Sequence, residues 1–213
     1  MVRKMILARK VGMTHVFDDQ GRSIPVTVLK AGPCYVTQIK KTEKDGYNSI
    51  QLAFEEKKEH RVNRPLRGHF QKANVPPCRF LREVRVDNPE EYQVGQVLAS
   101  DLFAPGDYVD VSAVSRGKGF AGSIKRLGFG RGPESHGSHY HRGPGSLGAV
   151  EPSRVFKGRL LPGRMGGRRR TVQNLQVVQS DASKNLLLVK GSIPGPRGGL
   201  VEVRTAVKGG RRS

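Results

Sequence analysis

The sequence predicts a mainly β fold, a small barrel or sandwich, interrupted by one long excursion with no fold of its own. Short segments that alternate apolar and polar residues, rich in β-branched side chains, recur on both sides of the chain's middle. Between them, residues 115–171 hold 13 Lys and Arg, two acids, 14 Gly and four Pro in 57 residues, without a sustained apolar period. A segment of this composition cannot bury enough apolar surface to offset the entropy lost on ordering it.

The expected strands before the excursion are separated by turn signals. The alternating segments are residues 24–31, 34–39, 49–54 and the second half of 102–114. A turn signal at residues 44–46 separates the second segment from the third. One helix is expected from Pro65 to Ala73, with Asn63 or Arg64 near its start and Asn74 after its end.

Short strands are expected again after the excursion, at residues 171–178, 185–190 and 200–207, with turns at 181–185 and 194–199. Because both ends of the excursion lie in expected strands, it should leave and re-enter one body. The predicted domains are a discontinuous β body, residues 1–114 and 172–213, and a basic, Gly-rich extension, residues 115–171. Within the body, an insert at about residues 55–95 carries the expected helix.

The net charge of the chain indicates which classes of partner it can bind. The chain has 38 Lys and Arg against 18 Asp and Glu, a formal net charge of +20. A polyanion, nucleic acid or an acidic membrane surface, best relieves the resulting self-repulsion. No apolar run approaches the roughly 20 residues that cross a bilayer, and the start of the chain lacks the apolar stretch of a secretory signal. Cys34 and Cys78 are too few for a disulfide scaffold. A cytoplasmic protein without a membrane span is expected.

The extension carries the side chains of an RNA-binding segment. Glycine lets the backbone approach another surface closely, arginine offers parallel donors to a phosphate, and lysine adds a point charge. Aromatic rings are interleaved with the cations and are suited to stacking on unpaired bases. The alternative interpretation is a solvated linker. The candidate RNA-binding residues are Lys118, Phe120, Lys125, Arg126, Arg131, His136, His139, His141, Arg142, Arg154, Lys157, Arg159, Arg164, Arg168, Arg169 and Arg170.

Gly117 to Gly122 match the G-x-G-x-x-G pattern of dinucleotide-binding loops. That pattern requires a strand before it, a helix after it and an acidic residue about 20 positions further on. A strand and a short helix fit the local sequence, but residues 136–141 contain no acid and no βαβ alternation follows. A nucleotide-dependent enzyme therefore remains an alternative function. A soluble RNA-binding assembly factor is a second alternative.

His136, His139 and His141 form a local cluster that resembles part of a zinc site. However, Cys34 and Cys78 have no C-x-x-C partners, and no fourth ligand is obvious near the histidines. No G-x-S-x-G nucleophile pattern occurs, and the two acids of the extension are 17 positions apart. We therefore expect no metal, no other cofactor, no catalytic residue and no enzymatic activity.

Two smaller basic features lie outside the extension. Residues 1–10 include Arg3, Lys4, Arg9 and Lys10, and the chain ends in a basic tail at residues 208–212. Each of these features either contacts phosphate or is a solvated terminus.

Several motifs, in order along the chain, carry a resemblance to a known family. They are Gly12-Met-Thr14, residues 24–32, Asp45-Gly-Tyr47, Gly68-His-Phe70, residues 115–122, Lys125-Arg126, Ser135-His-Gly137, residues 142–146, residues 155–158, residues 162–166, residues 185–191 and Ile193-Pro-Gly195. Together they resemble, essentially from end to end, the bacterial form of the universal large-subunit ribosomal protein three family.

The resemblance implies a six-stranded translation-protein barrel with a short helical insert, on the solvent side of the large ribosomal subunit. It also implies an extension that enters 23S rRNA toward the peptidyl transferase centre, contacts with neighbouring large-subunit proteins, and an early role in subunit assembly. It implies no small-molecule substrate. Many bacterial members carry a methylated glutamine directly after a Gly-Ser-Leu-Gly turn, whereas here Ala149 follows Gly148. That modification is therefore expected to be absent or moved.

Overall fold

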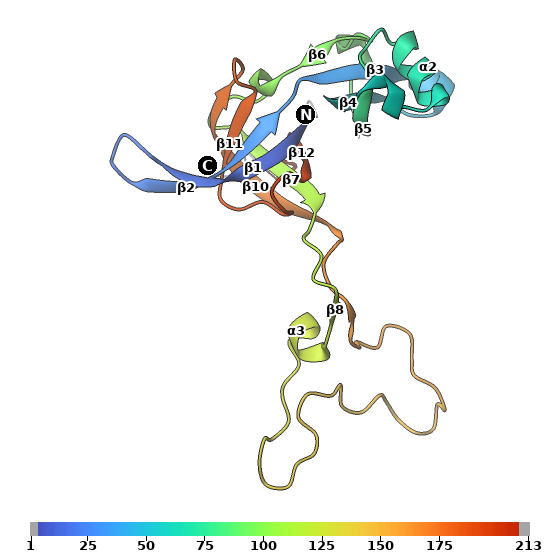
Figure 1. The fold of residues 1–213 in the computed structure, drawn as a ribbon, viewed down its shortest axis with the longest axis vertical. Coiled ribbons are helices and arrows are strands. Elements are labelled where there is room, and N and C mark those ends of the chain that lie inside the picture. The colour runs from blue at the N-terminus through green and yellow to red at the C-terminus, as the bar shows by residue number, and fades with distance from the viewer. Residues whose placement is uncertain (1–3, 209–213) are drawn as a thin grey trace. The chain divides into compact units, whose positions relative to one another are not determined.

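The computed structural model describes residues 4–208, which form two units (Figure 1). The first unit consists of the chain up to Val114 and again from Arg169 onward, and the second unit is Ser115–Arg168. The first unit contains a closed barrel, whose six strands are, in the order of their pairing, β1 (Met5–Phe17), β12 (Leu200–Thr205), β7 (Tyr108–Val114), β10 (Arg169–Asp181), β11 (Leu186–Lys190) and β2 (Ser23–Ala31). The mainly β class and the six-stranded barrel are thus confirmed.

Alternating aliphatic residues build the interior of the barrel. Ile6 of β1 lies opposite Val203 of β12, and Val203 lies opposite Val111 of β7. All three side chains are fully buried. Because successive residues of a strand face opposite sides of the sheet, their immediate neighbours point outward from the barrel. Closure of the barrel pairs the strands all round this core.

The first four residues of strand β1 are buried on both faces, and this strand was not among the expected ones. Met5, Ile6, Leu7 and Ala8 are all buried, although residues 1–10 were interpreted as a basic terminus. Ile6 and Ala8 face the barrel interior. Leu7 faces outward, and its carbonyl accepts a hydrogen bond from Cys34 Sγ at 3.4 Å. A continuous apolar run is the pattern of a strand covered on both sides, and this run was the missed signal.

The cations beside this run take part in the fold. Arg9 makes two hydrogen bonds to the Glu55 carboxylate, at 2.8 and 2.7 Å, and Lys10 Nζ donates to the carbonyls of Ile193 and Gly195 at 2.8 and 3.2 Å. Residues 1–3, including Arg3, and residues 209–213 of the basic tail lie outside the described residues.

A second sheet packs on the outside of the barrel. Its strands are, in order, β5 (Cys78–Arg85), β4 (Ser49–Glu56), β3 (Cys34–Lys40) and β6 (Val97–Leu98). Val36, Ile50 and Leu52 belong to the same apolar core as the barrel residues. The alternation in residues 34–39 and 49–54 predicts strands of the body, with the insert beginning at about residue 55, whereas both segments belong to this second sheet. Alternation shows that a strand is half-buried, but not which sheet it joins.

The helices of the first unit are short. They are α1 (Thr42–Asp45), α2 (Arg64–Lys72) and three 3-10 turns, Glu59–Arg61, Pro89–Glu91 and Ser100–Leu102. Helix α2 is the expected helix, one residue earlier at each end; the Asn63 side chain accepts a hydrogen bond from the Leu66 amide at 3.2 Å, and Phe70 is buried. No helix between residues 4 and 208 is long and apolar enough to span a membrane.

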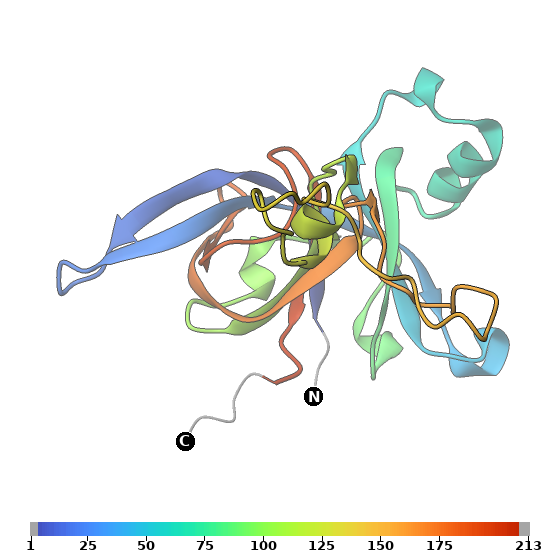
Figure 2. The same cartoon turned by 90° about the horizontal axis from the view of Figure 1, so that it is seen from below.

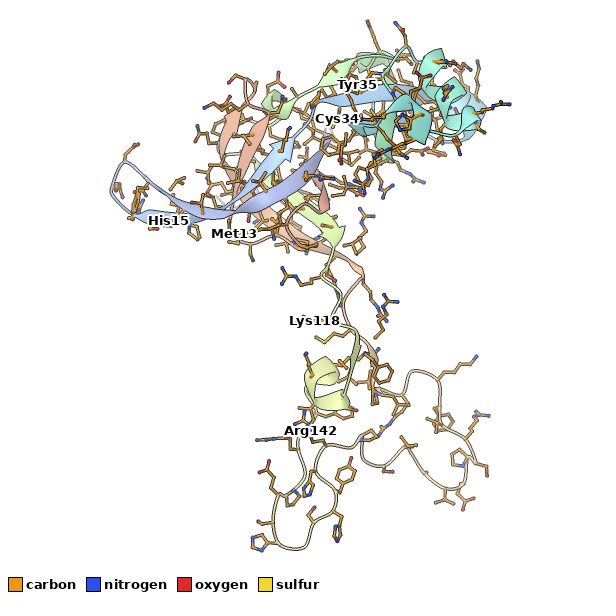
Figure 3. All side chains as sticks on the ribbon, viewed as in Figure 1. Met13, His15, Cys34, Tyr35, Lys118 and Arg142 are labelled. Carbon is orange, nitrogen blue, oxygen red and sulfur yellow. The ribbon has the colours of Figure 1, made fainter. Side chains whose placement is uncertain are left out.

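Strands β1 and β2 continue past the barrel as a projecting hairpin (Figure 2). β1 pairs with β12 only as far as Arg9, and β2 pairs with β11 only from Val26 onward, whereas β1 and β2 stay paired with each other out to Phe17. Met13 and His15 lie on this projecting part (Figure 3).

Candidate nucleic-acid interface

The second unit, which we call the arm, begins as a two-stranded stem. The Ser115 amide donates to the carbonyl of Arg168, and the Lys118 amide donates to the carbonyl of Met165, both at 2.9 Å. Further along, β8 (Phe120–Ala121) pairs antiparallel with β9 (Gly163–Arg164). The backbone thus holds the two sides of the arm together where it begins.

A single short helix follows the stem. Helix α3 (Ser123–Leu127) ends at Gly128, which adopts a φ of 73° and donates its amide to the carbonyl of Ile124 at 2.9 Å. Arg126 on this helix is half-buried, and its guanidinium donates to the carbonyl of Leu161. This cation therefore helps to close the base of the arm as well as contributing charge.

Residues 128–162 contain no helix or strand. Backbone turns shape this loop: the Gly132 amide donates to the carbonyl of His141 at 2.9 Å, and His141 Nδ1 donates to the carbonyl of Pro133 at 2.7 Å. The loop folds closely around Tyr140, because a Cβ at Gly132 would lie 2.0 Å from the Tyr140 carbonyl oxygen. A Cβ at Gly143 would lie 2.4 Å from the Tyr140 ring. Here glycine permits a close approach of backbone to side chain.

The arm has almost no core. Within residues 115–168, all of which the structure describes, only Ala121 and Ser123 are buried. Phe120 is 80% exposed and Val150 is 91% exposed, and Phe156 is also exposed. Apolar side chains left in water favour a partner that covers them, and the aromatic ones are suited to stacking on bases.

Nearly all charged side chains of the arm are positive, and most of them form no ion pair with an acidic side chain of the arm. Residues 115–168 contain 11 Lys and Arg and two acids. Arg131 pairs with Glu134 at 3.1 Å, the Arg159 guanidinium donates to the carbonyl of Ser146, and Arg154 lies 5.3 Å from the centre of the Phe156 ring. These few contacts leave most of the cationic surface free for an anionic partner.

All but three of the candidate RNA-binding residues are exposed side chains of the arm. Arg126 is half-buried, and Arg169 and Arg170 lie in β10 of the barrel. Lys118 lies in the stem and Arg142 in the loop, and Figure 3 shows both side chains. Arg116, another exposed cation of the stem, lies in the same Gly-rich sequence but is not among the candidates. The exposed candidates are Lys118, Phe120, Lys125, Arg131, His136, His139, His141, Arg142, Arg154, Lys157, Arg159, Arg164 and Arg168.

The sequence analysis extended the arm to residue 171, but Arg169, Arg170 and Thr171 pair with Val114, Ala113 and Ser112 of β7. These three residues continue the barrel ladder, and the Arg169 guanidinium donates to the Glu202 carboxylate of β12. The basic composition of the arm runs on into β10, so composition alone did not mark the boundary.

The alternative sites lack their required structural context. Every strand pairing among residues 4–208 is antiparallel, so Gly117–Gly122 does not lie in the βαβ unit that a dinucleotide loop requires. Over the same residues, no three His, Cys, Asp or Glu side chains gather in a group able to hold a metal ion.

The fold and this site define a class of protein: a closed β-barrel that carries an exposed cationic arm. The family model described as "Ribosomal protein L3" matches residues 83–185. The chain is 61% identical over 205 residues to "Large ribosomal subunit protein uL3" of Pelotomaculum thermopropionicum, covering 96% of this chain and 98% of the relative. The protein of the same name from Carboxydothermus hydrogenoformans is 60% identical over 206 residues, 97% of this chain and 99% of the relative.

The chain belongs to the ribosomal protein L3 family. The family resemblance stated from the motifs is thereby confirmed. Members of this family are structural proteins, so the chain is not an enzyme, and the nucleotide-dependent alternative is excluded.

Proposed function

We propose that this protein is a structural constituent of the large ribosomal subunit that binds 23S-type rRNA directly through the arm. The relatives are named as proteins of the large ribosomal subunit, which gives the cytoplasmic ribosome as the location. The observation that carries the proposal is an arm with 11 cations, two acids and two buried residues. Such a segment gains a stable environment only among phosphates and unpaired bases.

The arm binds chiefly through charge. Each cation that neutralises a phosphate releases condensed counterions, and these contacts position the protein without reading base sequence. Exposed rings such as Phe120 and Phe156 add stacking on splayed bases. RNA shape therefore supplies the specificity, while the cations supply most of the affinity.

The mechanism predicts a steep loss of affinity with salt. A protein that makes six to ten phosphate contacts loses roughly 10³–10⁵ in affinity between 50 and 200 mM salt. We expect a loss of this size for the full chain on a 23S-type rRNA transcript, measured by filter binding. The triple variant Lys118→Ala, Arg142→Ala, Arg154→Ala should lower the slope of log K against log salt by about two to three. Salt-independent binding of the unmodified protein would contradict the proposal.

We further propose that the arm extends toward the peptidyl transferase centre and that the protein acts early in subunit assembly. Val150, the most exposed apolar residue of the loop, is a suitable position for a probe, because the native cysteines are buried. A Val150→Cys protein carrying an iron chelate should cleave nearby rRNA around that centre in reconstituted subunits. Cleavage confined to rRNA at the subunit surface would contradict this course of the arm.

A structural constituent and a soluble assembly factor differ in stoichiometry. A constituent remains at one copy per mature large subunit through a high-salt wash, whereas an assembly factor leaves mature particles. Quantitative mass spectrometry of purified subunits should give one copy. Omission of the protein at the start of in vitro reconstitution should block assembly. Its addition at a late stage should restore assembly only in part.

A further inference from the structure

Within the first unit, three arginines from three strands converge on one carboxylate. Glu202 of β12 accepts from the guanidinium of Arg169 of β10 and, at 3.1 Å, from that of Arg204 of β12 itself. Arg82 of β5, in the second sheet, brings its Nε to 3.3 Å from the other carboxylate oxygen. We call Glu202, Arg82, Arg169 and Arg204 the arginine cluster.

Strand register explains why these residues meet. Glu202 lies opposite Ser112 of β7, and Ser112 lies opposite Thr171 of β10. The Ser112 and Thr171 hydroxyls are 2.7 Å apart, which marks one row of side chains across the outer face of the barrel. Arg204 lies two residues after Glu202 on β12, and Arg169 lies two residues before Thr171 on β10, so both share the face of this row. Long guanidinium side chains reach the carboxylate from both directions.

The carboxylate is buried beneath the cations that it holds. The Glu202 side chain is 11% exposed, whereas those of Arg82, Arg169 and Arg204 are 49%, 54% and 39% exposed. Three positive charges against one negative charge leave the group with a net charge of +2. Each guanidinium has five N–H donors, far more than two carboxylate oxygens accept. Unused donors therefore face solvent from side chains whose positions the carboxylate fixes.

This arrangement differs from the other ion pairs of the first unit. Lys40 and Glu83 form a one-to-one pair at 2.6 Å, and Glu55 is shared by Arg9 and Arg79. In the arginine cluster, by contrast, three cations share one carboxylate. An excess of held donors is typical of an anion site rather than of a closed salt bridge.

We propose that the arginine cluster is a preformed site for a backbone phosphate of RNA, separate from the arm. The proposal rests on the proposed function for its partner, RNA. A phosphate offers two acceptor oxygens at the spacing of a guanidinium fork and carries the charge that the +2 group lacks. Arg169 is the first residue of β10, and its guanidinium is held by Glu202 of β12 within the first unit. Glu202 acts as a positioning residue that keeps three like charges together.

The test compares two arginines of one strand in the full-length protein. Arg82→Ala removes a member of the cluster, and Arg85→Ala is the matched control, because Arg85 is an exposed cation of β5 that lies beside the Tyr47 ring. Both changes lower the net charge by one. On a 23S-type rRNA transcript, we expect Arg82→Ala to lose about tenfold in affinity and about one in salt slope, and Arg85→Ala clearly less. Arg82→Lys, which keeps the charge but not the fork, should lie between them.

Ethylation interference identifies the kind of contact. Ethylation of certain phosphates should weaken binding of the unmodified protein. For at least one of these phosphates, ethylation should no longer weaken binding of Arg82→Ala or Arg204→Lys. Ethylation of the same phosphate should still weaken binding of Arg85→Ala. Identical interference patterns and equal affinities for Arg82→Ala and Arg85→Ala would overturn the proposal and leave the cluster as a structural ion network. If Arg82→Ala bound RNA normally but its subunits lost a neighbouring protein, the proposal would be overturned. The partner of the cluster would then be an acidic protein surface. Failure of the unmodified protein to bind RNA would instead refute the proposed function.

Discussion

Gly166 shows how one residue holds the stem of the arm together. Its φ is +71°, and a Cβ placed on it would lie 2.1 Å from the carbonyl oxygen of Arg116. Both facts exclude a side chain, since L-residues rarely adopt this φ and the opposite strand occupies the space. Gly117, in the same stem, would have nothing within 4 Å of an added Cβ and therefore tolerates one.

Gly166→Ala should therefore open the stem, whereas Gly117→Ala should not. Backbone strain of this kind costs about 1–3 kcal/mol, which corresponds to amide exchange faster by about 5- to 150-fold. The amides to follow are those of Lys118 and Met165, which donate across the stem at 2.9 Å. Hydrogen exchange with mass spectrometry gives the comparison, and equal protection in the two variants would show that the close approach does not matter.

Burial controls the chemistry of both cysteines. Loss of hydration raises the pKa of the Cys34 thiol to about 12, and burial raises the pKa of Cys78 to about 12 as well. The native protein therefore keeps both thiols protonated at pH 8. We expect no labelling by iodoacetamide at pH 8 until the chain is unfolded, as measured by intact mass. Labelling of the folded protein would show that these thiols are accessible.

The raised pKa values of the two thiols make the free energy of unfolding depend on pH in the alkaline range. In the unfolded chain a thiol ionises near pH 8.5, so ionisation there favours only the unfolded state. The thiols contribute their full stabilisation below about pH 8.5 and lose it progressively as the pH rises toward 12. The decrease in urea midpoint between pH 8 and pH 10 should be smaller in a Cys34→Ala, Cys78→Ala variant. An equal decrease would assign the pH dependence to other groups.

At the scale of elements, helix α2 depends on a local cap and one packed face. Asn63 satisfies the Leu66 amide, and Phe70 buries itself with Val62 and Ala73 in a small cluster separate from the main core. The sequence predicted this helix because the residues that mark its start and its end, Asn63 and Asn74, are local signals. It did not predict β1, whose identity depends on a second sheet that covers its outer face.

Asn63→Ala should destabilise the protein by about 1 kcal/mol, because the Leu66 amide loses its acceptor. Asn63→Asp keeps a capping oxygen and should remain near the stability of the unmodified protein. Urea unfolding followed by circular dichroism measures both changes. Loss of the same free energy in both variants would mean that the amide side chain matters for a reason other than capping.

At the scale of the whole molecule, the barrel is closed by strands from both sides of the arm. β1, β2 and β7 precede the arm, and β10, β11 and β12 follow it, yet β12 pairs with β1 and β7, and β11 pairs with β2. The two parts of the chain therefore share one core. The arm joins them covalently but adds little buried surface.

Limited trypsin digestion should cut the arm of the free protein and leave the barrel in one piece. Two fragments are expected on a denaturing gel, and a single species on size exclusion until urea is added. In the assembled large subunit the arm should resist cleavage, because RNA supplies the contacts that it lacks alone. Fragments that separate without denaturant would contradict a shared core. An arm equally resistant in both states would show that its own stem, helix and turns protect it without RNA.

The β class, most strands, helix α2 and the location of the cationic arm could all be predicted from the sequence alone. These follow from local composition, from the two-residue alternation of the strands and from the residues that start and end a helix. Three features depend instead on contacts between distant segments: residues 34–40 and 49–56 form a second sheet, Arg169–Thr171 belong to the barrel, and Arg82 and Arg204 join Arg169 around Glu202. The physical reason is that strand pairing and barrel closure bring together residues far apart in the chain, and no local pattern records which distant strand becomes the neighbour.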